Sequence, residues 1–521
     1  MSALVVGPAL GSGRLVGHGN LDQWAHGWGM HWFASELVSG ELPWTVHGAA
    51  WPSTRVLWYV DPMGALLAAP LQLMGPIAAY NGLQLFQVAV AAFSGWAFGR
   101  ALGGRGWVSG VAVATMPLLQ TELWNGVVEA SWVGLIAGAA ALAARGSRWT
   151  GVVVGLVGVA SPYHGLGAAV LAGSLLLLGG PDSQGGRRAR LLACLLAAFL
   201  SLALTLPHAA MLAKGFSSTE PFVLRPMWSG LNEPSLRLNA TDWVAFLRPG
   251  EFWSLTPSDA PTAVPWKHTP YLGWLLLGGA TVAWVRSRSL RWLILPFAFS
   301  VVISLGFFLW HDQDFVTNAE GLRYKLPLAY VSEWLQVELT HHMRFAGMAC
   351  VVLAGLADRA AARWGPLVAV GVCLENLVVA PNCWPPPSSD ATLPAVLASL
   401  PDDGLAVVDL PAQLGEGNAT NRYLFWQAMH GHPVPWNNKV GMTGFQNAAL
   451  TSWIRMSRDQ GVRSRDDLQG GIEELREAGF GYVVLHPEWA EGPEVVERHR
   501  QALDQFLGTP DEIEGDFLYR L

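Results

Sequence analysis

Residues 187–213, which read RRARLLACLLAAFLSLALTLPHAAMLA, decide the fold class of this 521-residue chain. Three arginines stand at the start of the stretch, and residues 191–213 contain no Asp, Glu, Lys or Arg. An apolar run of about 20 residues is long enough to cross a bilayer as a helix. Only 14% of the whole chain is charged, against about 25% in soluble proteins. The chain is therefore predicted to be an α-helical polytopic membrane protein.

Nine further apolar stretches are similar to residues 190–213, which predicts a helical bundle of about ten or eleven spans. The predicted spans are 77–99, 106–119, 131–144, 149–162, 164–180, 190–213, 271–285, 291–310, 345–357 and 364–380.

Arginines lie in every second connection between these spans, and most carboxylates of the membrane half lie in the other connections. Positive charge beside a span marks its cytoplasmic end. The acidic loops 214–270 and 311–344 are therefore predicted to face outward from the plasma (inner) membrane. The arginine-bearing connections contain Arg100, Arg105, Arg145, Arg148, Arg187, Arg188, Arg190, Arg286, Arg288, Arg291, Arg359 and Arg363.

Three regions are predicted along the chain. Residues 1–76 form an outer-face loop, with an amphipathic helix over 19–42 and a proline-broken dipping segment over 56–76. Because the apolar residues ahead of this loop are too few to cross a bilayer, we expect a first transmembrane helix to begin before this sequence does. Residues 77–380 form the transmembrane bundle.

A soluble α/β domain is predicted outside the membrane over residues 381–521. It follows a proline-rich linker, and its apolar runs and amphipathic stretches alternate as strands and helices do. The predicted strands are 404–410, 481–486 and 517–521, and the predicted helices are 466–478 and 493–506.

Several classes of function are excluded by what the sequence lacks. A net charge of −7 argues against a nucleic-acid partner. The four cysteines form no CxxC pair, which excludes a cysteine-type zinc site. Nucleotide-binding and hydrolase motifs are absent, so the sequence offers no cofactor fingerprint.

Asp22 is the first candidate for chemistry, in the run GHGNLDQW at the head of the outer loop. A carboxylate at a membrane interface can serve as a general base. Its alternative role is structural, because Asn20 or Asp22 is also a good N-cap for the helix that follows.

Two more carboxylates and two histidine-bearing motifs lie in the predicted outer connections. Glu122 and Glu129 are spaced to share a helix face, where they could hold a divalent cation or simply be solvated. His164, in ASPYHG, could contact a phosphate or a metal, or only hydrogen-bond locally. The run HHMRF, with His341, His342 and Arg344, suits a lipid-linked phosphate, although Arg344 could instead snorkel to the interface.

The layout resembles that of bacterial multi-pass proteins of the GT-C glycosyltransferase superfamily, which use polyprenyl-phosphate sugars as donors. The resemblance is carried by Gly19-Asn20-Leu21-Asp22, by SELVSGELPW (35–44), by DPMGALLAAPLQLMGPIAAYNGLQLF (61–86), by ELWNGVVEASW (122–132) and by HHMRFAGMACVVLAGLA (341–357). The tail motifs VVDLP, MHGHPV and FGYVVLH add to it. Asn20 stands where the first acidic residue of that family's outer-loop motif would be.

The resemblance implies transfer of a sugar to an acceptor hydroxyl on the outer face, by one inverting displacement with Asp22 as base. Arg344, His341, His342 and Lys325 would then bind the donor phosphate. Glu122, Glu129 and His164 would orient the acceptor or a divalent cation such as Mg or Mn. The implied partners are a lipid-linked sugar donor, membrane lipids, and a saccharide, lipid or protein acceptor.

Two other functions remain open from the residues alone. A transporter or flippase of lipid-linked saccharides would place charges near the middle of the bilayer, often in repeated halves. Here the charges gather at the outer surface and no internal repeat is apparent, which favours the enzyme. A non-catalytic envelope scaffold would instead require an apolar binding patch on the tail.

Overall fold

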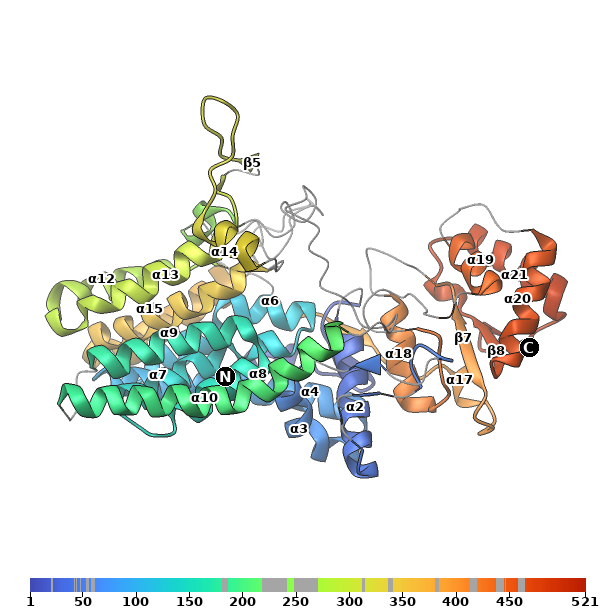
Figure 1. Ribbon diagram of the computed structural model, residues 1–521, viewed down its shortest axis with the longest axis horizontal. Coiled ribbons are helices and arrows are strands. Elements are labelled where there is room, and N and C mark those ends of the chain that lie inside the picture. Colours follow the sequence, from blue (N-terminus) through green and yellow to red (C-terminus); the bar gives the residue numbers. More distant parts are fainter. Residues whose placement is uncertain are drawn as a thin grey trace.

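The computed structural model consists of an elongated helical bundle with a smaller mixed domain at one end (Figure 1). The structure describes residues 1–19, 22–41, 43, 45–46, 48–52, 56–57, 61–179, 186–217, 241–247, 270–311, 314–335, 341–379, 384–412, 419–436, 445, 447–457 and 464–521. Asn20 and most of the loop 214–270 therefore lie outside the described residues.

A helix lies at each of the ten predicted spans. The bundle helices are α4 (Pro76–Ala101), α5 (Trp107–Thr115), α6 (Pro117–Asn125), α7 (Gly134–Ala144), α8 (Thr150–Ala160), α9 (Pro162–Leu178), α10 (Arg187–Ser217), α12 (Trp274–Arg286), α13 (Ile294–Ser304), α15 (Ala346–Ala361) and α16 (Gly365–Leu374). Among the described residues, three helical stretches are long and apolar enough to cross a membrane, 76–101, 188–210 and 342–378. This number is smaller than the ten or eleven spans that the sequence predicted.

One predicted span is divided in the structure. The stretch 106–119 breaks between α5 and α6, at Met116, because Pro117 has no N–H to continue the ladder and instead begins a new helix. The short helix α6 then carries Glu122 across the end of the bundle.

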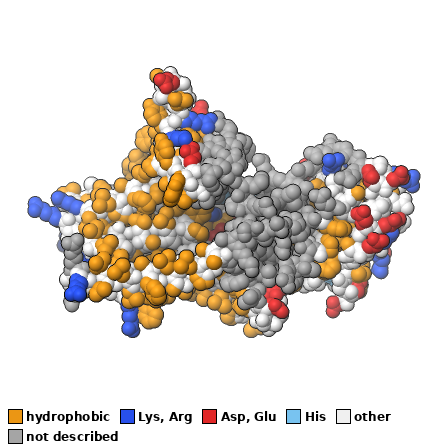
Figure 2. All heavy atoms as spheres, in the orientation of Figure 1, with side chains coloured by type: hydrophobic (Ala, Val, Ile, Leu, Met, Phe, Trp, Pro, Cys, Tyr) orange, Lys and Arg blue, Asp and Glu red, His pale blue; other side chains and the backbone are white. Residues whose placement is uncertain are grey.

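The arginine-bearing turns meet at one end of the bundle. Arg359 Nη1 donates to the Leu102 carbonyl at 2.5 Å, and its Nε donates to Ser287 Oγ at 3.4 Å, which joins three of these turns. Asp358 accepts from the N–H groups of Gly106 and Val108 and so caps α5. Figure 2 shows Lys and Arg side chains around this end and apolar side chains along the bundle.

Residues 1–76, the predicted first outer region, consist of short elements around one longer helix, α2. These elements are α1 (Ser2–Val5), η1 (Gly7–Ala9), β1 (Arg14–Val16), α2 (Gln23–Ser39), β2 (Thr45–Val46), β3 (Val56–Leu57), α3 (Pro62–Ala68) and η2 (Ala69–Met74). The connections within the bundle add η3 (Glu129–Val133), η4 (Trp243–Phe246), η6 (Arg288–Leu293), β4 (Trp310–His311), β5 (Asp314–Phe315), α14 (Pro327–Leu335), η7 (His342–Phe345), η8 (Ala362–Trp364) and η9 (Glu375–Val379).

Helix α2 was predicted to be amphipathic, with an exposed polar face, and the structure corrects this expectation. Trp24 and Trp28 are fully buried, and the polar side chains of Gln23 and His26 are buried as well. The reason is a second covering element from the tail, the helix α18 (Ala419–His430), which lies beside α2.

Three side-chain contacts fasten α18 to α2. The Gln427 amide oxygen accepts from the indole N–H groups of Trp28 and Trp32, at 2.9 and 2.6 Å. Gly27 has no room for a side chain, since a Cβ there would lie 2.7 Å from the Phe425 ring. The tail is therefore a packing partner of the first outer region.

The tail contains a four-stranded sheet in the order β7-β8-β10-β9. β7, β8 and β10 lie at the three predicted strands, and β9 was not predicted. β7 and β8 are parallel, and the other neighbours are antiparallel. Before the sheet, β6 pairs with β1 in the register Arg14↔Asp390, so the start of the tail is held against the first outer region. The tail elements are β6 (Ser388–Asp390), α17 (Ala395–Ala398), β7 (Ala406–Leu410), α18, α19 (Ala448–Met456), α20 (Arg465–Glu477), β8 (Phe480–Leu485), η10 (Pro487–Trp489), α21 (Pro493–Leu507), β9 (Asp511–Ile513) and β10 (Asp516–Arg520).

A buried histidine in this sheet leads to a pH-dependent prediction. Burial alone would lower the pKa of His486, but hydrogen bonds to Asp409 and Asp516, each at 3.1 Å, outweigh burial and raise the pKa to about 9. Because the unfolded value is about 6.5, this stabilisation of about 3 kcal/mol is complete below pH 6.5 and is lost as the pH rises through 9. Thermal unfolding of the solubilised chain should therefore separate wild type from His486→Gln more at pH 6 than at pH 9.5.

His499 provides the matched control for this measurement. It is also buried, but its pKa is lowered to about 4 by burial, so it stays neutral over the whole range. The unfolded imidazole has a pKa of about 6.5 and binds a proton at pH 6, which lowers the stability of wild type by about 1 kcal/mol at pH 6 but not at pH 9.5. His499→Gln should therefore gain about that much at pH 6 relative to pH 9.5, which is opposite in sign to the effect of His486→Gln. An equal pH dependence for the two variants would contradict the assigned charge on His486.

Candidate active site

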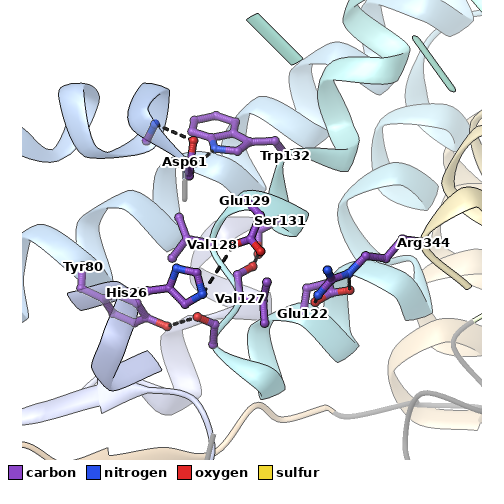
Figure 3. A network of polar contacts seen from close by, with 12 residues as sticks. His26, Asp61, Tyr80, Glu122, Val127, Val128, Glu129, Ser131, Trp132 and Arg344 are labelled. Atoms are coloured by element: carbon purple, nitrogen blue, oxygen red, sulfur yellow. Dashed lines mark hydrogen bonds and ion pairs between the residues drawn. The ribbon is translucent and has the colours of Figure 1, made fainter. Parts of the chain in front are cut away.

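The candidate site lies at the bundle end away from the arginine turns, where α2, α3, α6, η3 and η7 meet. Figure 3 shows Asp61, His26, Glu129, Glu122 and Arg344 around the loop that joins α6 to η3. Residues from four separate stretches of the chain are thus gathered in one region.

Arg344 and Glu122 form a buried ion pair in the middle of this region. Nε and Nη2 of Arg344 donate to the two carboxylate oxygens at 2.8 and 3.1 Å. Their side chains are 7% and 0% exposed, and the guanidinium carbon also lies 5.5 Å from the centroid of the Tyr163 ring. The two-point geometry fixes the guanidinium plane and leaves Nη1 as its remaining outer nitrogen.

Helix α4 supports the α6–η3 loop by its polar side chains. The Tyr80 hydroxyl donates to the Gly126 carbonyl at 3.2 Å, and the Gln87 amide donates to the Val128 carbonyl at 2.8 Å. Next to this loop, the half-buried Glu129 carboxylate lies 3.5 Å from His26 Nε2. The loop therefore has a defined position, and Glu129 points toward α2 (Figure 3).

Asp61 belongs to this region, although the sequence analysis did not place it among the site residues. It is a buried carboxylate at φ +43°, and it accepts from Trp132 Nε1 at 2.7 Å and from the Gly64 N–H at 2.8 Å. Burial raises its pKa to about 7, against the lowering effect of these two hydrogen bonds. The available signal was the Asp-Pro pair at the start of the 61–86 block.

Asp22 occupies the N-cap position of α2, but its side chain makes no N-cap hydrogen bond. Its backbone N–H donates to the Asn125 carbonyl at 3.0 Å, so the start of α2 is joined directly to the end of α6. The side chain is half-buried. The sequence left two roles open for Asp22, a general base and an N-cap. The side-chain hydrogen bond that defines an N-cap is not made.

Of the other predicted residues, the histidines lie in or beside this region, whereas Lys325 lies in the loop between α13 and α14. His164 is buried, and its Nε2 lies 2.7 Å from the Ala130 carbonyl in η3. His342 is buried with its ring 4.4 Å from that of Phe307, and His341 precedes it at φ +54°. Lys325, just before α14, forms an ion pair with Glu333 of that helix at 2.6 Å.

The described carboxylates and histidines do not form a ready-made cation site. No group of three or more metal-ligating side chains occurs within the described part of the chain. Both oxygens of Glu122 accept from Arg344, and both oxygens of Asp61 accept from Trp132 and Gly64. Within the described residues, the carboxylates of Glu122 and Asp61 are therefore engaged by Arg344, Trp132 and Gly64 and do not converge on a common point.

Gly126 sets the distance between α6 and α2, which leads to a second prediction. It has φ +73°, and a Cβ there would lie 2.5 Å from Gln23 Cβ and 2.6 Å from the Gln23 backbone nitrogen. Gly126→Ala should therefore force the two segments apart and lower any activity of the site by about 100-fold, as a displacement near 1 Å does.

Gly40 is the matched control, because it also ends a helix at φ +77° but has no atom within 4 Å of the Cβ position. Gly40→Ala carries the same backbone strain without the collision. Equal losses of activity in the two variants would show that strain, rather than the approach of Gln23, is responsible.

Comparison with solved structures shows what this arrangement is similar to. The arabinofuranosyltransferase AftD from Mycobacteria aligns with 94% of this chain at a TM-score of 0.54 and 14% identity. The chain has the GT-C fold. It covers 35% of the length of the AftD chain.

Two further GT-C structures align over most of this chain with lower scores. The oligosaccharyltransferase of Archaeoglobus fulgidus aligns with 92% of it at a TM-score of 0.46 and 11% identity, covering 68% of that enzyme. ArnT from Cupriavidus metallidurans, solved with undecaprenyl phosphate, aligns with 97% of it at 0.38 and 14%, covering 94% of ArnT. No protein-family model and no curated protein matches the sequence.

Proposed function

We propose that this chain is a membrane glycosyltransferase that moves a sugar from a polyprenyl-phosphate donor to an acceptor hydroxyl on the extracytoplasmic face. The observation that carries the proposal is the position of Asp22, a half-buried carboxylate joined through its backbone to the end of α6, at the end of a GT-C fold away from the arginine turns. In this proposal the arginine turns face the cytoplasm, and residues 381–521 form a domain outside the membrane.

Asp22 acts as the general base in the proposed reaction. Its carboxylate takes the proton from the acceptor hydroxyl as that oxygen attacks the anomeric carbon. The bond from the anomeric carbon to the phosphate oxygen breaks at the same time, and the lipid phosphate leaves with the electron pair. The displacement is single, so the configuration of the anomeric carbon is inverted.

Arg344 stabilises the negative charge that develops on the leaving phosphate. Glu122 holds the guanidinium at two points, so the cation is fixed before the substrate binds. In this role, Nη1 would be the nitrogen that faces the phosphate. His341 adjoins Arg344 in sequence and could add a donor, whereas Lys325 would have to leave its contact with Glu333 to do so.

Glu129 and His164 are proposed to orient the acceptor rather than to react. Glu129 is held near His26, and His164 is held by the Ala130 carbonyl, so both side chains have fixed positions around the η3 turn. Neither a covalent intermediate nor a nucleotide is needed.

The proposal is tested by transfer of radiolabel from polyprenyl-phosphate hexoses in membranes that contain the chain. We expect the label in a glycosylated product whose anomeric configuration is opposite to that of the donor. Membranes without the chain are the control. Passage of labelled lipid-linked saccharide across the bilayer without any transfer product would instead support a transporter.

A further inference from the structure

Arg422, on the tail helix α18, is a buried cation with no hydrogen-bond acceptor among the described residues. The residue is 6% exposed, and its Nε is fully enclosed without a partner. Its recorded contacts are with two indole rings, Trp489 at 3.3 Å and Trp24 at 4.8 Å from the guanidinium carbon to the ring centroids. Of the five N–H donors that an arginine carries, the one on Nε is therefore buried without an acceptor, which is costly.

No carboxylate among the described residues lies within ion-pair distance of this guanidinium. Asp390 and Glu488 act on Arg422 only through longer-range electrostatics. This differs from Arg344, whose carboxylate partner is in direct contact. A buried guanidinium without a carboxylate partner therefore indicates a position where a bound ligand would supply the anion.

Gly19 and Ser389 are the neighbours of Arg422 on the side of the first outer region. A Cβ on Gly19 would lie 3.2 Å from Ser389 Oγ and 3.6 Å from Arg422 Nη2, so the Gly19 backbone packs closely against Ser389 and lies next to the guanidinium. The Gly19 carbonyl is held by Trp24 Nε1 at 2.8 Å, and Ser389 Oγ donates to the Gly17 carbonyl at 3.0 Å. The guanidinium of Arg422, the hydroxyl of Ser389 and the backbone of Gly19 thus lie next to one another.

We propose that Arg422 binds an oxyanion group, a carboxylate or a phosphate, carried by the acceptor saccharide. The assignment to the acceptor rests on the proposed function. In an inverting displacement the acceptor and the leaving phosphate lie on opposite sides of the anomeric carbon. Arg422 stacks on Trp24, two residues from the base Asp22, so it lies on the acceptor side, whereas Arg344 lies on the bundle.

The tail would then select the acceptor. A planar guanidinium held between two indole rings can offer paired N–H groups to an oxyanion, which a neutral sugar does not provide. The ligand class is an acidic saccharide, bearing a uronate or a sugar phosphate, and a neutral hexose is excluded.

The test uses the full-length Asp22→Asn protein in detergent, so that binding is measured without turnover. The probes are a trigalacturonate, the neutral maltotriose, a hexose 6-phosphate and polyprenyl phosphate. We expect saturable binding of the trigalacturonate and the hexose phosphate, at least 10-fold tighter than that of maltotriose. Arg422→Met should remove this preference. Arg500→Met, which removes an arginine stacked on Phe517 elsewhere in the tail, should keep it.

Thermal unfolding separates a binding role from a packing role. Because Arg422→Met replaces unsatisfied donors by an apolar side chain, its melting temperature should equal or exceed that of the parent. A clear fall in melting temperature with unchanged binding would overturn the proposal, as would equal binding of trigalacturonate and maltotriose. Dependence on Arg422 for polyprenyl phosphate alone would overturn the assignment to the acceptor. Binding that follows the expectation in a chain without transfer activity would instead refute only the proposed function.

Discussion

Asp22→Asn is expected to lower kcat for sugar transfer by about 100- to 10,000-fold, the usual contribution of a positioned general base. The two side chains have the same shape, so substrate binding and KM should change little. Stability should also change little, because the amide has the shape of the carboxylate and the N-terminus of α2 is not capped by this side chain. The measurement is a kcat and KM determination with purified wild type and variant.

Asp242 provides a comparison for this variant. It is also a carboxylate in the outer loops, but its Oδ1 accepts from the Val244 N–H at 2.9 Å and caps η4. Asp242→Asn should therefore retain transfer. If Asp22→Asn keeps full kcat, or if both variants lose transfer equally, the base is another group, and Asp61 and Glu129 become the next candidates.

Periodicity and charge predicted the helical stretches well, because each depends only on nearby residues. The run 187–213 forms α10, and the alternating arginines predicted turns that Arg359 joins at one end. The strands 406–410 and 480–485 could be predicted from the sequence equally well, since both are short apolar runs bounded by polar residues.

Contacts between distant parts of the chain could not be predicted in the same way. Nothing in the spacing of α2 indicates that Gln427, about 400 residues later, bonds to Trp28 and Trp32. The burial of α2 depends on that contact, and for the same reason its polar side chains Gln23 and His26 are not exposed. The pairing of Arg344 with Glu122 is likewise invisible in sequence, because each residue alone fits a solvated loop.

Arg344→Met is expected to destabilise the protein by about 3–5 kcal/mol, because it leaves the carboxylate of Glu122 buried without its cation. Removing both charges should cost much less than the two single changes together. The double variant Glu122→Gln, Arg344→Met should therefore recover a large part of the loss. Chemical or thermal unfolding of the four proteins in detergent gives the coupling energy.

Lys325→Met serves as the control for this cycle, since Lys325 and Glu333 are equally close at 2.6 Å but more than a third exposed. An exposed pair contributes about 1 kcal/mol or less, so this variant should unfold almost like wild type. Transfer should be absent from the double variant even where its stability is restored, because Arg344, the side chain proposed to bind the leaving phosphate, is missing. Restored stability with restored transfer would show that Arg344 serves the fold alone, and the leaving phosphate would then have to be stabilised by other donors, such as His341.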